Sequence, residues 1–336
     1  KDSKKDQDHK KDSKSKSSKS NAAEPRTLSR SLTLTSFNLW NFNEPYLQRL
    51  NAICALLSDK PADWVGFQEA RYDYYKEWDS GEQYQQSASG SFNGTHRFQV
   101  EHLAECLPGH QFAFDPAHTD LHTDTGRFHV DEGLASFSRL PVLASSYLRL
   151  TRDFGDEFDA HQRLVQRSLV ETSLGPVNLF QTHLSLSPKA RLRNVREIWA
   201  YVQRFSSPQV LLGDLNATPN DQAIRYLCGK FKQDGESGDF VDAWSLAEDR
   251  SVIRSSSEGS GDRKDPDKVI RNGYTFSSFE PNKRIDFFLL RGWDLLPEAR
   301  VQGFEILGRQ TINGSNEAPM YVSDHFPIQL ILGERE

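Results

Sequence analysis

Two segments of this chain pass directly from apolar, strand-like residues into polar residues that can carry chemistry. The first is LLGDLNATP at residues 211–219, and the second is VSDHFPI at residues 322–328. Asp214 and Asn216 are two positions apart, so on an extended backbone their side chains point to the same side. An aspartate followed by a histidine opens the second strand. Carboxylate, amide and imidazole groups at strand ends predict a sheet scaffold that presents metal-assisted hydrolytic chemistry at its edge.

Four further strand-like segments end in, or carry, a polar residue of the same kind. These residues are Asn38 in TSFNLW, Glu69 in DWVGFQEA, His183 in FQTHLSL and Asp286 in KRIDFFLL. In this order, the six segments resemble the endonuclease/exonuclease/phosphatase superfamily, the group of DNase I, abasic-site endonucleases, deadenylases, neutral sphingomyelinases and inositol-phosphate 5-phosphatases. The resemblance runs from about residue 31 to about residue 333. It implies an α/β fold, a four-layer α/β sandwich with two central mixed sheets flanked by helices.

The resemblance also implies a metal site built from Glu69, Asn38 and Asp324. Glu69 follows the apolar run at residues 64–67, so its carboxylate emerges at a strand end. Mg²⁺ and Mn²⁺ prefer oxygen ligands, and Mg²⁺ keeps several waters, so one or two carboxylates suffice to hold it. We expect Asn38 to support the metal or to orient a ligand, and Asp324 to lie near the metal.

Five residues are expected to act on the substrate: His183, Asp214, Asn216, Asp286 and His325. In the pattern that the family implies, Asp286 orients the imidazole of His325, which can then take a proton from water. Asp214 is expected near the attacking water. Asn216 and His183 are expected at the phosphate oxygens, where charge builds in the transition state. The resulting mechanism is in-line attack by water without a covalent intermediate. A turn or helix N-cap is the structural alternative for the Asp-x-Asn motif.

Other candidate residues come from the middle of the chain. Arg139 and Arg167 resemble structural or phosphate-proximal positions of the family and are expected to contact the substrate. Glu132 is a further candidate acid. The segment AHTDLHTDTGRFH at residues 117–129 is rich in His and Asp. We interpret it as a polar surface loop rather than a transition-metal site, because ligands need supporting contacts that a mobile loop lacks. If it is functional, it is expected to contact the substrate.

The chain divides into a tail and one domain. Residues 1–30 are rich in Lys, Ser and Asp without apolar periodicity, which predicts disorder, and residues 31–334 form the expected catalytic domain. Helices are predicted at 44–58, 97–107, 188–205 and 219–228. Strands are predicted at 31–38, 63–69, 110–115, 133–138, 142–150, 163–172, 176–183, 209–213, 284–290, 300–307 and 326–332. Polar loops are predicted at 79–96 and 250–272.

Three cysteines lie at apolar positions of helix-like segments, namely Cys54, Cys106 and Cys228. The first interpretation is that all three are buried free thiols. One disulfide with one thiol left over is the alternative. Their spacing does not match that of a cysteine metal site.

The sequence leaves the substrate open among three hypotheses. The net charge of −6 argues mildly against long-range electrostatic capture of nucleic acid but does not exclude a nuclease, which is the first hypothesis. Arg191, Arg193 and Arg196 are candidate contacts to a phosphate backbone. A sphingomyelinase-like lipid phosphodiesterase is the second hypothesis, because residues 71–78 offer aromatic side chains for a membrane interface. An inert binding module on the same scaffold is the third.

The expected compartment is secreted or luminal, with the cytoplasm as the alternative. The sequence starts with Lys1 rather than Met, so we expect that the natural N-terminus is missing, and Asn93 and Asn313 open acceptor motifs for glycosylation. An odd number of cysteines favours the alternative slightly. No apolar run approaches the length of a membrane span, and the protein is expected to be a monomer.

Overall fold

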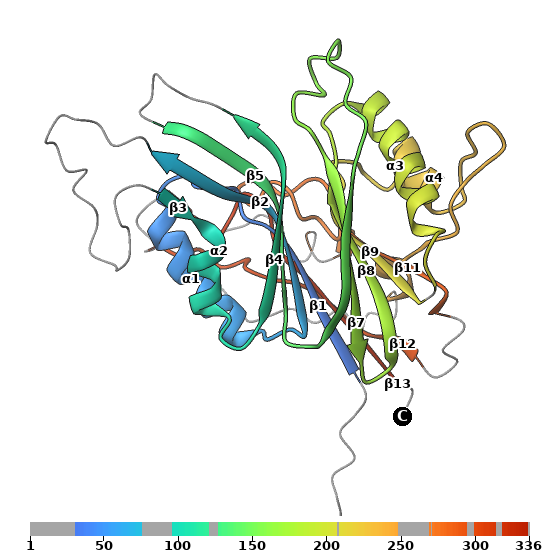
Figure 1. Cartoon of the computed structure of the whole chain (residues 1–336). Helices are drawn as coiled ribbons and strands as arrows, with labels where there is room; N and C mark the ends of the chain where they lie inside the picture. The colour runs from blue at the N-terminus through green and yellow to red at the C-terminus, as the bar shows by residue number, and fades with distance from the viewer. Residues whose placement is uncertain are drawn as a thin grey trace, which may run out of the picture.

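Two β-sheets lie face to face at the centre of the protein, and helices cover their outer faces (Figure 1). The computed structural model describes residues 31–75, 96–120, 127–206, 208–247, 269, 271–293, 299–313 and 318–334. Helices α1 (Tyr46–Asp59) and α2 (Gln99–Cys106) cover one sheet, and α3 (Pro188–Val202) and α4 (Gln222–Leu227) cover the other. The predicted four-layer α/β sandwich is confirmed. No helix in these described ranges has the length and hydropathy of a membrane span.

The first sheet has seven strands in the order β12-β13-β1-β2-β5-β4, with β3 paired to β2. Their bounds are β1 (Ser31–Asn38), β2 (Trp64–Tyr75), β3 (His96–Phe98), β4 (Gln111–Asp120), β5 (Arg127–Ser138), β12 (Ala299–Ile306) and β13 (Ile328–Glu334). Strands β1 and β2 run parallel, while the other pairs are antiparallel. The sheet is therefore mixed, as predicted.

The second sheet has six strands in the order β10-β11-β9-β8-β7-β6. Their bounds are β6 (Val142–Arg149), β7 (Leu164–Thr172), β8 (Gly175–His183), β9 (Gln209–Asp214), β10 (Val241–Asp242) and β11 (Asp286–Arg291), and a short helix α5 (Ala243–Leu246) follows β10. Strands β8 and β9 are the parallel pair of this sheet. Each sheet thus contains one parallel pair near its centre.

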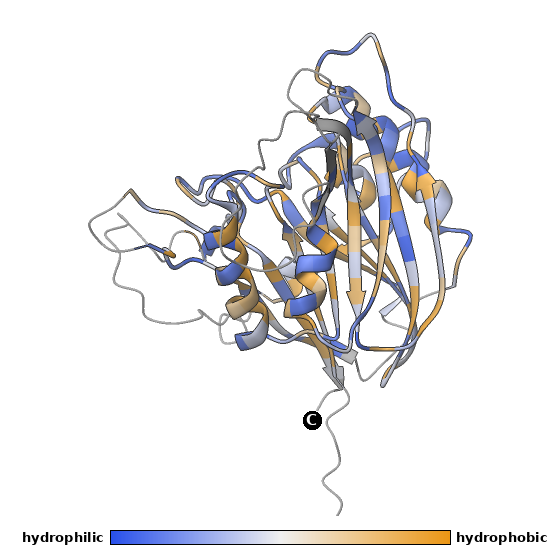
Figure 2. Cartoon of the chain, turned by 60° about the vertical axis from the view of Figure 1, so that its left-hand side comes forward, coloured by the Kyte–Doolittle hydropathy of each residue, from blue (hydrophilic) through white to orange (hydrophobic). Residues whose placement is uncertain are grey.

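The central strands are buried on both faces, which explains their nearly continuous apolar runs. In β9, Leu212 packs between the two sheets with Leu34 of β1 and Phe288 of β11. The neighbouring Leu211 points the other way and packs with Ile198 of α3. Figure 2 shows the hydrophobic residues of the strands and of the inward helix faces in orange. Successive residues of these strands thus face different layers of the sandwich. A one-residue slip would exchange the two faces, and this fixes the register of each strand.

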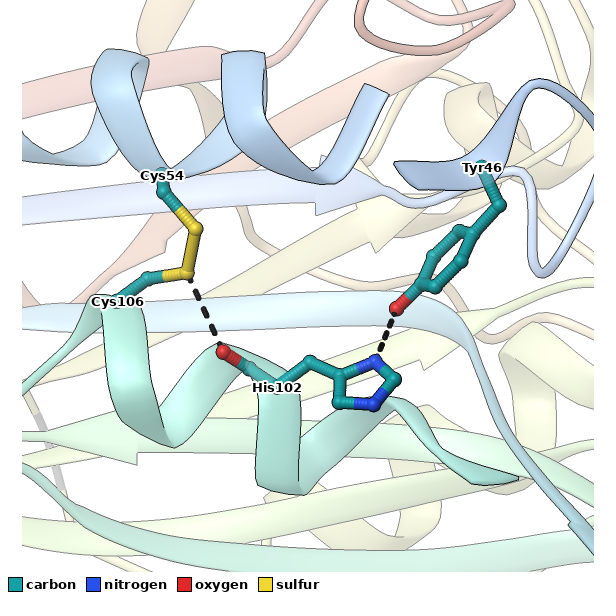
Figure 3. Close-up of a disulfide and its surroundings, with 4 residues drawn as sticks. All are labelled: Tyr46, Cys54, His102 and Cys106. Carbon is teal, nitrogen blue, oxygen red and sulfur yellow. Dashed lines mark hydrogen bonds between the residues drawn. A yellow bond between two sulfur atoms is a disulfide. The ribbon is translucent and has the colours of Figure 1, made fainter. Parts of the chain in front are cut away.

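A disulfide between Cys54 and Cys106 joins α1 to α2 on the outer face of the first sheet (Figure 3). The Tyr46 hydroxyl and the Nδ1 atom of His102 lie 2.8 Å apart and form a second contact between the same elements. Cys228 remains a free thiol. The interpretation of three free thiols is therefore wrong, and the alternative of one disulfide with one thiol left over is confirmed. The sequence does not show that these two helices pack side by side.

Most elements lie close to their predicted positions, with two informative differences. The segment at residues 117–129 is not simply a loop, because β4 continues to Asp120 and β5 begins at Arg127, with His118 paired to Glu132 across the two strands. Helix α4 begins three residues later than predicted, after a turn in which the Asp221 carboxylate accepts a hydrogen bond from the Thr218 hydroxyl. The predicted loops at 79–96 and 250–272 lie almost wholly outside the described residues.

Candidate active site

Strand directions bring the predicted site residues to one edge of the sandwich. Because β1 and β2 are parallel, Asn38 and Gln68 are register partners at the same end of the first sheet, and Glu69 follows immediately. Because β8 and β9 are parallel, His183 pairs with Asp214 in the second sheet. Asn38, His183 and Asp214 are the last residues of their strands, whereas β2 continues past Glu69 to Tyr75. The two sheets therefore present their acids, amides and imidazoles toward a common site.

The antiparallel strands add the remaining two acids and a histidine to this edge. Asp286 is the first residue of β11 and is the register partner of Asp214. Strand β13 runs antiparallel to β1, and Ile328 pairs with Ser36. The residues just before β13, Asp324 and His325, consequently reach the end of β1.

Asn38 links the two sheets through its side-chain amide. Its Nδ2 atom donates to Oε1 of Glu69 and to Oδ2 of Asp214, both at 3.1 Å. Its Oδ1 atom accepts from the backbone N–H of Trp40 at 2.9 Å. Because Asn38 is buried, these bonds fix the positions of the two carboxylates. These bonds show how Asn38 can orient the carboxylates beside it, and its expected place at the metal stays a prediction.

Glu69 lies on a backbone irregularity that turns it out of the sheet. The pairing of β2 with β5 shifts register between Phe67 and Ala70, and Glu69 has a positive φ of 56°. Asn216, two residues after the end of β9, has a φ of 47°. Non-glycine residues in this left-handed region are held there by their surroundings and cluster at functional sites. Both carry predicted site roles.

His325 lies between two carboxylates. Its Nδ1 atom is 3.0 Å from Oδ2 of Asp286, and its Nε2 atom is 3.5 Å from Oδ2 of Asp214. Burial lowers the pKa of His325, but the attraction of Asp286 and Asp214 outweighs it and raises the pKa to about 10. Burial raises the pKa of Asp214 to about 7. The three residues therefore form a buried system that can hold and pass on a proton.

His183 and Asn216 lie on the other side of Asp214. The Nε2 atom of His183 is 3.4 Å from Oδ2 of Asp214 and 3.1 Å from Nδ2 of Asn216. The guanidinium of Arg163 donates to Nδ1 of His183 at 2.9 Å, so the neutral ring carries its proton on Nε2. Burial, followed by repulsion from Arg163, lowers the pKa of His183 well below its usual value. The ring is thus neutral and presents an N–H group to the site.

Arg163 is a site residue that the sequence reasoning missed. It is buried at the start of β7, beside His183, and the charges of Glu132 and Glu69 act on it. A buried guanidinium among carboxylates is suited to contact a phosphate. Its position as the first residue of the strand predicted at 163–172, which pairs with the His183 strand, is the only sequence signal that pointed to it.

The donor set at this edge fits a divalent cation. Burial, together with repulsion from Glu69, raises the pKa of Asp324 to about 6 and that of Glu132 to about 7. The raised pKa values mean that the negatively charged forms of these carboxyl groups are disfavoured, in part because they repel one another. A positive charge between them would offset this repulsion. Their oxygen atoms match the preference of Mg²⁺ and Mn²⁺. Glu132 thus lies beside the site, in agreement with its candidacy as a further acid.

Among the described residues, Asp214, Asp286 and His325 also bring potential ligand atoms within 4.8 Å of one another. Their closeness is already explained by the hydrogen bond between His325 and Asp286. The metal site expected at Glu69, Asn38 and Asp324 stays a prediction.

Arg139 and Arg167 do not join this cluster. Arg139 pairs with Asp63, which precedes β2 at the end opposite Glu69, with Nη2 and Oδ1 2.7 Å apart. Arg167 donates to Oδ1 of Asn178 and lies over the ring of Phe205. Both arginines thus stabilise the far end of the sandwich. Both side chains have protein partners away from the cluster, and their expected contact with the substrate stays a prediction.

The arginines of α3 are engaged in ion pairs rather than held free for a phosphate backbone. Arg191 pairs with Asp221, Arg193 with Asp159 and Arg196 with Asp234. Arg191 also donates to the carbonyl groups of Ser185 and Leu186. Their contacts stabilise the surroundings of α3.

Comparisons with known proteins identify the family. The profile of the Endonuclease/Exonuclease/phosphatase family matches residues 35–325, and the chain belongs to this family. The family resemblance predicted from the sequence is therefore confirmed. As the family name states, its members are nucleases and phosphatases, which hydrolyse phosphate esters. No curated protein sequence matches the chain significantly.

Several solved structures are similar over most of their length. An endonuclease/exonuclease/phosphatase family protein from Bacteroides thetaiotaomicron is 20% identical, with 90% of this chain and 94% of that chain covered and a TM-score of 0.59. A mannosyl-6-phosphatase from the same organism is 20% identical, with 90% and 99% covered and a TM-score of 0.60. D. rerio TDP2 complexed with single strand DNA product is 15% identical, with 90% and 99% covered and a TM-score of 0.58. At these identities, the similarity shows the DNase I-like fold.

Proposed function

We propose that this protein is a metal-dependent phosphodiesterase and that its substrate is nucleic acid. The observation that carries the proposal is the hydrogen-bonded cluster at the sheet edge. In it, Asn38 joins the carboxylates of Glu69 and Asp214, and Asp286 holds His325 against Asp214. This arrangement supplies metal-binding oxygen atoms, a proton acceptor and N–H donors within one site. Family membership supports hydrolysis of a phosphate ester.

In this proposal, Glu69 and Asp324 would hold Mg²⁺ or Mn²⁺, and the bound ion would neutralise charge on the phosphate and lower the pKa of bound water. Asn38 fixes the orientation of Glu69. Because the two carboxylates keep His325 protonated, Asp214 takes the proton of the attacking water at its Oδ2 atom, and His325 holds that carboxylate in position. Asp286 keeps the imidazole ring in the required orientation.

The transition-state charge is met by groups on the opposite side of Asp214. His183 offers its Nε2–H group, whose orientation Arg163 fixes by donating to Nδ1. The Asn216 amide lies beside His183 and is the second neutral group at the phosphate oxygens. Donors that are already oriented stabilise developing charge without reorganisation. No covalent intermediate is required.

Nucleic acid is preferred among the substrates for two reasons. Arg163 and the neutral His183 are buried donors suited to a phosphodiester oxygen. A structurally similar protein, TDP2, is described in complex with a single-stranded DNA product. Another similar protein is a mannosyl-6-phosphatase, so the fold alone leaves the substrate open.

A lipid phosphodiester is the second candidate because of exposed apolar side chains near the site. Phe154, Phe158 and Leu186 are 84%, 60% and 60% exposed. The Ser185 hydroxyl donates to the carbonyl of Phe158, which brings the segment between β6 and β7, with Phe154 and Phe158, against the segment after β8, with Leu186. Exposed apolar groups next to a catalytic site are consistent with an amphiphilic substrate.

We further propose that residues 31–334 act as one catalytic domain and that the protein functions as a monomer. The disulfide between Cys54 and Cys106 supports a secreted or luminal compartment over the cytoplasm, because structural disulfides persist in oxidising environments.

The test is a substrate comparison with one protein preparation. Plasmid DNA, single-stranded RNA and sphingomyelin vesicles are incubated with Mg²⁺ or Mn²⁺, with EDTA and with the His325→Ala variant as controls. Cleavage of a nucleic acid that is lost in both controls supports the proposal. Cleavage of sphingomyelin alone would transfer the assignment to the lipid candidate. If a folded protein cleaves neither substrate class, the choice of substrate is wrong.

A further inference from the structure

A buried glutamine joins two segments that flank Glu69. Gln99 is the first residue of α2, and its side chain is buried. Its Oε1 atom accepts a hydrogen bond from the backbone N–H of Arg71 at 2.8 Å, and its Nε2 atom donates to the backbone carbonyl of Asn41 at 2.7 Å. Arg71 lies two residues after Glu69 on β2, and Asn41 belongs to the segment that follows β1. One side chain thus connects both segments.

Gln99 occupies a position that packing alone would fill with an apolar residue. Val100 and Leu103 of the same helix are buried in a core cluster with Phe67 of β2. Gln99 precedes Leu103 by four residues, so the two side chains lie on the same face of α2. A buried amide costs free energy unless it is hydrogen-bonded. The two backbone partners of Gln99 satisfy its amide, and both belong to segments that carry the site.

The contact with Asn41 reaches the carboxylate of Glu69. The Nδ2 atom of Asn41 is 3.4 Å from Oε2 of Glu69, while Asn38 donates to the other oxygen, Oε1. Asn41 has a positive φ of 33°, which a residue other than glycine keeps only when its surroundings hold it there. Its carbonyl oxygen accepts from Nη2 of Arg49 at 3.0 Å as well as from Gln99. These two donors fix the backbone of Asn41 and thereby direct its amide toward Glu69.

The contact with Arg71 lies next to the backbone irregularity that turns Glu69 out of the sheet. The pairing of β2 with β5 shifts register between Phe67 and Ala70, and Glu69 lies within this shift. Such a shift disrupts the ladder of backbone hydrogen bonds locally. The backbone N–H of Arg71 is just beyond it, where the side chain of Gln99 supplies the acceptor. Gln99 therefore holds the backbone on the far side of Glu69.

Helix α2 presents Gln99 from a fixed element. Cys106, at the other end of α2, forms the disulfide with Cys54 of α1. His102 of α2 contacts the hydroxyl of Tyr46, with 2.8 Å between Nδ1 and the oxygen atom. A side chain on a well-anchored helix holds its partners more precisely than one on a loop.

We propose that Gln99 is a positioning residue for Glu69 and that it acts through Asn41 and through the backbone at Arg71. This inference rests on the proposed function, in which Glu69 would hold the divalent cation. Gln99 is buried beneath these segments and acts only through them. Removal of a residue that orients a metal ligand typically weakens metal binding by about 10–100-fold. Loss of both hydrogen bonds of Gln99 is therefore expected to weaken metal binding about tenfold.

The test measures the affinity for Mn²⁺ by isothermal titration calorimetry in the wild type, the Gln99→Met variant and the control Gln209→Met. Methionine keeps the unbranched shape of glutamine and removes its hydrogen bonds. Gln209 is also buried, and its Nε2 atom donates to the backbone carbonyls of Val202 and Phe205. It begins β9, whereas Asp214 ends that strand. The control thus loses comparable hydrogen bonds at the opposite end of the sheet.

We expect Gln209→Met to bind Mn²⁺ as the wild type does and Gln99→Met to bind it about tenfold more weakly. Circular dichroism verifies that each variant is folded. The Asn41→Gly variant is a second test, because it removes the amide beside Glu69 while glycine accepts the positive φ. It should also weaken binding, and its affinity decides if Gln99→Met does not fold. The inference is overturned if either site variant keeps the wild-type affinity, or if Gln209→Met loses as much as Gln99→Met.

Hydrolysis of bis(p-nitrophenyl) phosphate by the wild type is measured separately. A wild type that binds Mn²⁺ but does not hydrolyse this ester would contradict the proposed function, and the affinities would still decide the role of Gln99. A wild type that binds no Mn²⁺ would overturn both.

Discussion

Replacement of Arg49 with methionine tests how the fold holds the loop that follows β1. Arg49 is a fully buried residue of α1, and its guanidinium makes six hydrogen bonds to five backbone carbonyl groups. The acceptors are Leu39, Trp40, Asn41, Asn43 and Val322. The same loop places Nδ2 of Asn41 3.4 Å from Oε2 of Glu69. The arginine therefore acts on the site through the loop.

The expected loss of stability follows from these contacts. A hydrogen bond to a charged group contributes about 1.5–3 kcal/mol, but the buried guanidinium also loses its hydration, so the six values do not add. Removing one partner of a buried charged network costs about 3–5 kcal/mol, and we expect the Arg49→Met variant to lie in this range. Methionine retains most of the apolar stem, so the loss reports mainly on the unsatisfied carbonyl groups.

Urea denaturation measures this free energy of unfolding directly. The Arg204→Met variant is the control, because Arg204 is exposed and lies only over the ring of Tyr201, and its change should stay within about 0.5 kcal/mol. The Arg49→Lys variant keeps the charge but has fewer donors, and it should fall between the wild type and Arg49→Met. A loss below about 1 kcal/mol for Arg49→Met would refute the reasoning.

Three further predictions concern the site and the cysteines. The Asp214→Ala variant should lose about 10³-fold in rate with an unchanged circular dichroism spectrum, and full activity would remove Asp214 from the mechanism. Burial raises the pKa of Cys228 from 9.0 to about 11, so the thiol stays neutral at pH 8. Its alkylation by iodoacetamide should be about 100-fold slower than that of an ordinary thiol, and the rate should rise with pH until about pH 11. A rate that reaches its plateau near pH 9 would contradict this prediction. Reduction of the Cys54–Cys106 disulfide should lower the free energy of unfolding by about 2–4 kcal/mol, and the Cys228→Ser variant should show the same sensitivity to reductant.

Strand-end motifs made the fold and most of the site predictable from the sequence. Polar residues beside apolar runs identified Asn38, Glu69, Asp214 and Asp286 as candidates. Three of them bound a strand, since Asn38 ends β1, Asp214 ends β9 and Asp286 begins β11. The sheet topology then brought them together, as the family resemblance implied. The sequence could not show how Asn38 divides its hydrogen bonds, since these depend on the distance between the two sheets.

Long-range contacts explain what the sequence reasoning missed. Arg163 resembles any other arginine near a strand until β7 is placed beside β8. Arg139 and Arg167 looked equally suitable for substrate, but their partners, Asp63 and Asn178, lie at the other end of the sandwich. The pairing of Cys54 with a distant cysteine likewise depends on helix packing. Local patterns identify which residues can do chemistry, and only the tertiary arrangement selects among them.

The most direct measurement of the central claim is metal-dependent hydrolysis of bis(p-nitrophenyl) phosphate by the wild type and the Glu69→Gln variant. The account predicts turnover with Mg²⁺ or Mn²⁺ and none with EDTA. The rate of the variant should be about 10³-fold lower, because the glutamine side chain keeps the shape of glutamate but lacks its charge. Circular dichroism verifies that the variant is folded. Turnover that persists in EDTA, or that is equal in the two proteins, would contradict the account.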